Sequence, residues 1–73
     1  MEEKLATEFS DHLVFSTKKL NTLIEGLRES CSEEELRPYL DKISHIIALN
    51  FDLLDLVGDE FPHLNPYEKG EHH

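Results

Sequence analysis

Apolar side chains recur every three or four positions along the first half of the chain. The row comprises Leu5, Phe9, Leu13, Ser16, Leu20, Leu23 and Leu27. Ala6 and Ile24 lie beside this row and widen it. Side chains with this spacing share one face of an α-helix. We therefore predict a first helix over about residues 3–29.

A new helix start is encoded just after a short polar stretch. Ser32 is followed three positions later by Glu35, which is the pattern of a capping box. Glu33 and Glu34 favour the same start because negative charge is stabilised at a helix N-terminus. Pro38 lacks an amide donor and crowds a preceding carbonyl, so either a kink or a separate first turn remains open there. We predict a second helix over about residues 33–60.

The second helix carries two apolar rows. The first comprises Leu36, Leu40, Ile43, Ile47, Asn50, Leu54, Val57 and Phe61. The second comprises Tyr39, Ile46, Leu49, Leu53 and Leu56. Together they cover more than half of the circumference, whereas a helix that faces one neighbour needs an apolar arc of only about 100°. This helix is therefore expected to contact more than one neighbour.

These patterns predict an all-α fold: a two-helix antiparallel hairpin that dimerises into a four-helix bundle. A hairpin by itself covers only one of the two rows, and a two-fold homodimer is the commonest way to cover the other. A different protein that supplies helices would serve equally well. The predicted dimer or partner interface comprises Tyr39, Ile43, Ile46, Asn50, Leu53, Leu56 and Val57.

Asn50 is a polar residue at the centre of the apolar arc. A buried amide is destabilising unless it finds a hydrogen-bond partner. Counting back from the turn places it near Ser16, so it is expected to bond either Ser16 or its own copy across a two-fold axis. Either bond would set the register of the helices. Ligand binding by Asn50 is the alternative.

The helical pattern ends after Gly58. We predict an extended C-terminal segment over residues 61–67, whose Phe61, Leu64 and Tyr67 pack over the end of the bundle, with a frayed tail as the alternative. Residues 68–73 are interpreted as a disordered tail or the remnant of an expression tag. Residues 1–67 therefore form a single domain.

Three apolar residues lie off the main rows and suggest a second, exposed docking surface. They are Val14, Phe15 and Phe51. The alternative is that the dimer buries them, as the wide apolar arc would allow.

Charge narrows the choice of partners. The chain has 73 residues and a formal net charge of −9, which disfavours direct binding to nucleic acids and to anionic membranes. The same charge suits a protein partner with a basic surface, and mimicry of a nucleic acid is a sharper form of that hypothesis. A lone Cys31 and the lack of a long apolar segment lead us to expect a cytoplasmic location.

No catalytic, cofactor-binding or metal site is predicted. His12 follows Glu8 by four positions and His45 follows Asp41 likewise, but this spacing occurs more often on solvated helix surfaces than in metal sites. Acidic neighbours disfavour a reactive thiolate at Cys31.

The sequence therefore predicts a small non-enzymatic protein-interaction module, a homodimeric adaptor, inhibitor or regulator that acts through an acidic and partly apolar surface. The alternatives are an RNA-binding helical-hairpin dimer, which the acidic composition opposes, and a bundle that binds metal through carboxylates and histidines.

Overall fold

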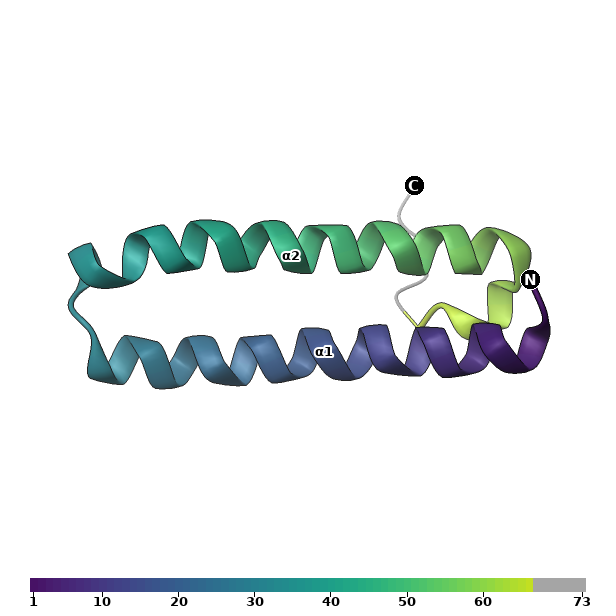
Figure 1. Cartoon of the computed structure of the whole chain (residues 1–73), viewed down its shortest axis with the longest axis horizontal. Helices are drawn as coiled ribbons and strands as arrows, with labels where there is room; N and C mark the ends of the chain where they lie inside the picture. The colour runs from purple at the N-terminus through teal and green to yellow at the C-terminus, as the bar shows by residue number, and fades with distance from the viewer. Residues whose placement is uncertain (67–73) are drawn as a thin grey trace.

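Two long helices lie side by side in opposite directions in the computed structural model, which describes residues 1–66 (Figure 1). Helix α1 spans Glu3–Ser30 and helix α2 spans Glu33–Glu60. One 3-10 turn, η1, follows at Pro62–Leu64. No strand occurs in residues 1–66. The all-α hairpin is confirmed, and its pairing into a four-helix bundle stays a prediction.

The tight turn between the helices is organised by the predicted capping box. The amide of Glu35 donates to Ser32 Oγ at 3.2 Å, and the amide of Ser32 donates to Glu35 Oε1 at 3.2 Å. Each side chain thereby satisfies an amide that the first helical turn leaves without a helical partner. Helix α2 begins before Pro38, which lies inside it.

The seam between the helices differs from the predicted face of the first helix by a rotation of about one residue. Helix α1 buries Ala6, Ser10, Leu13 and Thr17 against α2. Leu5 and Leu23, which the prediction placed on this face, are 54% and 48% exposed. The prediction was wrong at these two positions because it followed the largest side chains, whereas Leu13 and Ala6, which it also included, are buried. Small side chains on α1 instead leave room for the fully buried Leu54 and for Val57 on α2.

Asn50 lies in this seam and is satisfied within the hairpin. Its amide nitrogen donates to Thr17 Oγ1 at 3.2 Å and to Ser16 Oγ at 3.4 Å. The expected bond to Ser16 is confirmed, and Thr17 is a second acceptor that sequence reasoning missed. Sliding the helices by one turn would bury the amide without a partner, so this layer favours one register.

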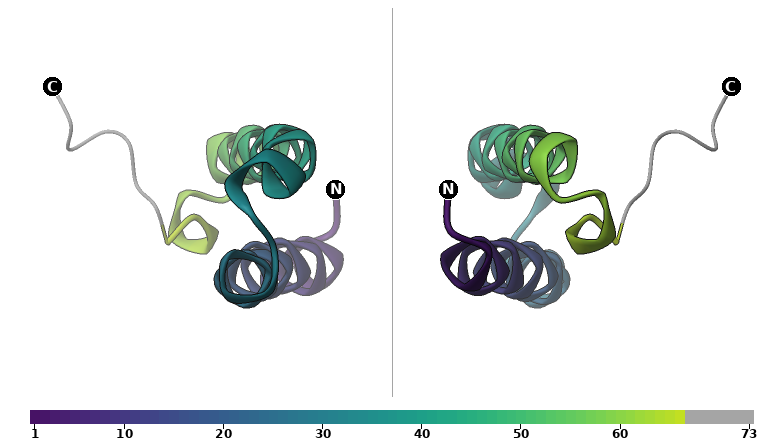
Figure 2. Two further views of the ribbon diagram at one scale, coloured as in Figure 1. Left: turned by 90° about the vertical axis from the view of Figure 1, so that its left-hand side faces the viewer. Right: turned by 90° about the vertical axis from the view of Figure 1, so that its right-hand side faces the viewer.

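The chain beyond α2 folds back along one side of the hairpin (Figure 2). The amide of Leu64 donates to the Phe61 carbonyl at 2.9 Å, so residues 62–64 turn as a 3-10 helix instead of running extended as predicted. Asn65 Nδ2 donates to Asp55 Oδ1 at 3.1 Å and fastens the segment to α2. The predicted packing of Tyr67 lies outside the described residues.

The N-terminus, the end of α2 and η1 meet at the open end of the hairpin. The ammonium group of Met1 lies 2.8 Å from Glu60 Oε2, and His63 Nε2 lies 2.9 Å from Glu3 Oε2. These pairs are solvent-exposed, so each contributes little stability. Neither α1 nor α2 contains a stretch apolar enough to span a membrane.

Candidate protein-interaction surface

The hairpin has two broad faces that differ in what covers them. The residues that immediately precede seam positions lie to one side of each helix, and those that follow lie to the other. Two antiparallel helices are related by an approximate two-fold axis normal to the plane that contains them. Rotation about this axis carries one helix onto the other without exchanging the two broad faces of the hairpin. Residues that precede seam positions on α1 and α2 therefore share one face of the hairpin.

That face carries a large group of exposed apolar side chains, and we call it the open face. Its members are Leu5 and Leu23 of α1 with Tyr39, Ile46, Leu49, Leu53 and Leu56 of α2. Exposure of these side chains ranges from 37% for Leu53 to 65% for Leu56. Large apolar patches are rare on monomeric proteins and usually mark an interaction surface.

The predicted interface residues divide between the open face and the seam. Tyr39, Ile46, Leu53 and Leu56 lie exposed on the open face. Asn50 and Val57 are buried between the two helices, and Ile43 is half-buried there.

Three members of the open face were not among the predicted interface residues. The spacing of Leu49 between Ile46 and Leu53 was a sufficient signal for it. Leu5 and Leu23 could not be assigned to the open face without the rotation of α1 that the structure reveals. The interface assignment itself stays a prediction.

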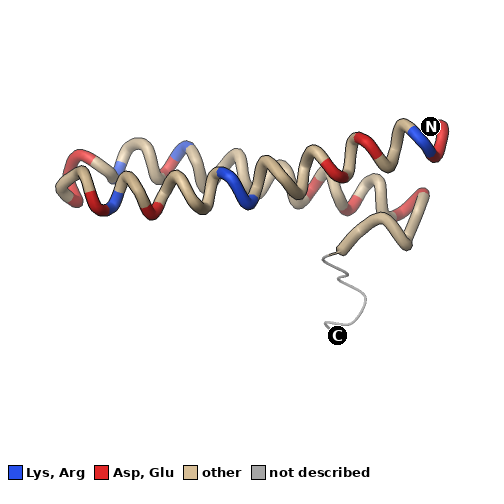
Figure 3. Tube along the Cα trace, turned by 90° about the horizontal axis from the view of Figure 1, so that it is seen from below, with Lys and Arg blue, Asp and Glu red and all other residues tan. Residues whose placement is uncertain are grey.

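The acidic residues of α2 avoid the middle of the open face. Asp and Glu outnumber Lys and Arg along both helices (Figure 3). Three of the four carboxylates on the second half of α2 lie at seam-following or outward positions, namely Asp52, Asp55 and Asp59, and the fourth, Glu60, lies at the end of the open face. Between Lys42 and Glu60, the open face of α2 carries only apolar side chains. The open face of α2 therefore presents an uncharged apolar strip between Lys42 and Glu60.

The opposite face is partly covered by the C-terminal segment. Gly58 follows the seam residue Val57 and lies beneath Asn65, whose Cβ would be 2.9 Å from a Cβ at this position. Because glycine has no side chain, η1 can approach the backbone of α2 closely. Residues 61–66 therefore lie on the face opposite the open face and do not cover it.

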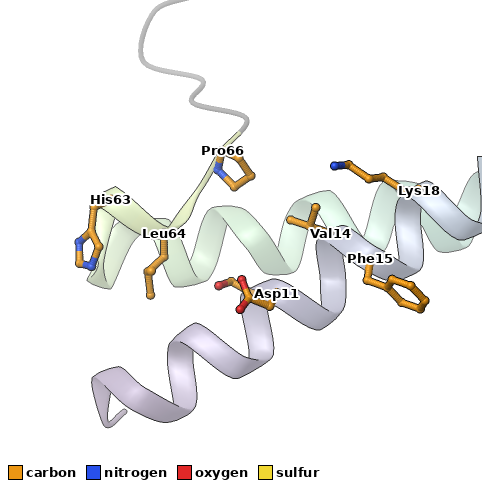
Figure 4. Close-up of a pocket in the computed structure, with 8 residues that line it drawn as sticks. Asp11, Val14, Phe15, Lys18, His63, Leu64 and Pro66 are labelled. Carbon is orange, nitrogen blue, oxygen red and sulfur yellow. The ribbon is translucent and has the colours of Figure 1, made fainter.

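A shallow groove of about 520 Å³ separates the C-terminal segment from α1 (Figure 4). It is lined by Ser10, Asp11, Val14, Phe15, Lys18, His63, Leu64 and Pro66. Of the predicted second docking residues, Val14 and Phe15 lie in this groove and Phe15 is 65% exposed. Phe51 is half-buried on α2 and does not line it. The structure thus brings Val14 and Phe15 together with the C-terminal segment, an approach that local spacing could not reveal.

The two histidines considered for metal binding lie on different helices and do not join a group of three ligands within residues 1–66. His12 and His45 are both exposed, on α1 and α2 respectively. Within residues 1–66, no three His, Cys, Asp or Glu side chains gather closely enough to hold a metal ion. Cys31 is a half-exposed residue at the C-terminal cap of α1.

Comparison with protein-family models, curated proteins and solved structures yields no match.

Proposed function

We propose that this chain is a small non-enzymatic protein-interaction module that works as a homodimer. Two hairpins pair through their open faces into a four-helix bundle, which serves as an adaptor, inhibitor or regulator of another protein. The observation that carries the proposal is the uncharged strip of exposed apolar side chains on α2, flanked by Leu5 and Leu23 of α1.

The size of the hairpin core supports this proposal. In residues 1–66 the buried apolar side chains are Ala6, Leu13, Leu36, Leu54 and Val57. Chains of fewer than about 70–80 residues rarely gain more than about 3–5 kcal/mol from a single core. Pairing of two open faces would add Ile46, Leu49, Leu53 and Leu56 to the buried apolar surface and so increase the free energy of unfolding.

The outward position of the acidic residues suits a client with a basic surface. Asp41, Asp52 and Asp59 are exposed and lie away from the open face, so pairing through that face would leave them in solvent. Carboxylates of two copies would then form one negative surface that attracts a basic protein. This attraction would weaken with added salt.

Light scattering on a dilution series tests the homodimer. The chain has a mass of 8.5 kDa, and the proposal predicts twice this value at high micromolar concentration, with loss of helicity on dilution. A folded species that stays at 8.5 kDa throughout the series would overturn the proposal.

A matched pair of variants tests the face. Leu49→Glu and Ala48→Glu each add one negative charge at neighbouring exposed positions of α2, but only Leu49 lies on the open face. We expect Leu49→Glu to abolish dimerisation and Ala48→Glu to leave it intact. Equal effects of the two variants would contradict the assignment of the open face.

A further inference from the structure

Helix α2 carries a second, complete heptad row on its open face. Its members are Tyr39, Lys42, Ile46, Leu49, Leu53, Leu56 and Glu60, at alternating steps of three and four. The same alternation on the other row of α2 forms the seam with α1. An alternation of three and four is the pattern by which helices pair side by side over a long distance. The second row therefore has the spacing that packing against another helix requires.

The row is symmetric about position 51 in the shape of its apolar side chains and antisymmetric in charge. Leu49 and Leu53 lie two positions on either side of it, and Ile46 and Leu56 lie five positions away. Lys42 and Glu60 lie nine positions away and bear opposite charges. A helix turned end for end about this point would therefore present acid to base at both ends and leucine or isoleucine between them.

We propose that the open face binds a second copy of this chain with the two α2 helices antiparallel and level at Phe51. This assignment rests on the homodimer proposed above and specifies its geometry. Leu49 packs against Leu53 of the second copy, and Ile46 packs against Leu56 of the second copy. Lys42 forms an ion pair with Glu60 of the second copy, and the two-fold axis repeats each contact.

Charge favours this orientation over a parallel one. A parallel pair in register places Lys42 against Lys42 and Glu60 against Glu60, and like charges at facing positions are destabilising. Glu60 already lies close to the ammonium of Met1, at 2.8 Å. A carboxylate has two oxygens and four acceptor sites, so Glu60 can accept from Lys42 as well.

The dimensions of the face fit a stable dimer. Each helix has 28 residues and is therefore about 42 Å long, and two packed helices are roughly 20 Å wide. One face of the hairpin thus presents on the order of 800 Å², which is about the area that each partner buries in an interface of standard size. Since η1 lies on the opposite face, it does not obstruct the second copy (Figure 2).

Disulfide trapping in a Cys31→Ser background tests the geometry on the full chain. Leu49→Cys and Leu53→Cys chains are mixed in a glutathione redox buffer, and the bridges are identified by mass spectrometry. We expect the bridge between positions 49 and 53 to dominate, because facing residues alone approach within the roughly 7 Å between Cα atoms that a disulfide requires. Dominant 49–49 and 53–53 bridges in a protein of dimer mass would overturn the antiparallel geometry while leaving the homodimer standing. A monomer mass for the unmutated chain would overturn both.

Charge reversal supplies a second test that removes no apolar side chain. Lys42→Glu is expected to raise the dimer dissociation constant roughly three- to tenfold, and the Lys42→Glu, Glu60→Lys double variant is expected to restore it to within about twofold. Lys18→Glu is the control, since it makes the same change in charge beside the groove on the opposite face. Failure of the double variant to restore dimerisation, or an equal effect of Lys18→Glu, would overturn the pairing of Lys42 with Glu60.

Discussion

The side-chain amide of Asn50 donates a hydrogen bond to the hydroxyl of Thr17 across the seam, with a nitrogen-to-oxygen distance of 3.2 Å. The two residues are 9% and 2% exposed, so neither can exchange this partner for bulk water. The hydroxyl oxygen of Ser16 lies 3.4 Å from the same nitrogen. The three side chains form a polar layer in which Ser16 is nearest the surface. This layer links the helices at one register, because an unpaired buried amide is destabilising in any other.

The first prediction concerns the coupling between these residues. Asn50→Ala is expected to lower the free energy of unfolding by about 1–3 kcal/mol, because it leaves a cavity and removes both hydrogen bonds. Thr17→Val removes one acceptor while keeping the shape of the side chain. The loss in free energy of unfolding in the double variant should be smaller than the sum of the losses in the two single variants, by at least about 0.5 kcal/mol. The reason is that each single variant already removes the bond between Asn50 and Thr17.

Urea unfolding at fixed protein concentration measures these effects. Thr22→Val is the control, because the hydroxyl of Thr22 donates only to the Lys18 carbonyl on the exposed side of α1, at 3.1 Å. Its effect should stay within about 0.5 kcal/mol. Strict additivity of the Asn50 and Thr17 variants would contradict the coupling.

The second prediction concerns the capping box at the start of α2. Ser32→Ala is expected to lower the free energy of unfolding by about 1 kcal/mol, because the amide of Glu35 loses its acceptor. Glu35→Ala removes the reciprocal bond to the Ser32 amide. Thermal unfolding followed by circular dichroism reports both. Ser44→Ala, an exposed serine in the middle of α2, is the matched control and should not destabilise the protein. An equal decrease in the free energy of unfolding in Ser44→Ala and Ser32→Ala would rule out a capping effect.

The third prediction compares the two helical glycines. A Cβ at Gly26 would meet nothing within 4 Å, so Gly26→Ala should stabilise the protein by about 0.5–1 kcal/mol through helix propensity. A Cβ at Gly58 would lie 2.9 Å from the Cβ of Asn65. Gly58→Ala should therefore displace η1 from α2, and this displacement should cancel part of the stabilisation gained from helix propensity.

Amide hydrogen exchange at Leu64 and Asn65 separates these two effects. It should accelerate in Gly58→Ala and stay unchanged in Gly26→Ala, because only Gly58 lies beneath the C-terminal segment. Unchanged exchange in both variants would show that the close approach at Gly58 does not hold the segment in place.

The fourth prediction separates folding from association with one chemical change at two nearby positions. Leu54 is 1% exposed in the seam and Leu56 is 65% exposed on the open face. Leu54→Ala should lower the free energy of unfolding by about 2–5 kcal/mol at every protein concentration, because it leaves a cavity. Leu56→Ala should instead weaken dimerisation and leave helicity at high concentration nearly unchanged.

Sedimentation equilibrium and circular dichroism on the same samples provide the two readings. If Leu56→Ala lowers helicity at high concentration as much as Leu54→Ala does, Leu56 supports the hairpin itself and the open face is not an interface.

The amino-acid sequence by itself determined the two helices, the turn between them and the two apolar rows on α2. These features follow from contacts within a few residues: the three-and-four spacing of apolar side chains, and the exchange of hydrogen bonds between Ser32 and Glu35. Asn50 could also be recognised as the polar member of the seam, because it interrupts an otherwise apolar row.

Only the tertiary structure decided which side of α1 faces α2. Leu5 and Leu23 mark the more apolar side, yet α1 buries Ser10 and Thr17 instead. Small residues on α1 allow close packing against Leu54, and Thr17 supplies an acceptor to Asn50. Both contacts depend on residues of the opposite helix. The position of η1 was decided in the same way, since Asp55 and Gly58 meet Asn65 only after the chain reverses. Spacing along one helix measures the apolar character of its faces, but packing selects the face that fits its neighbour.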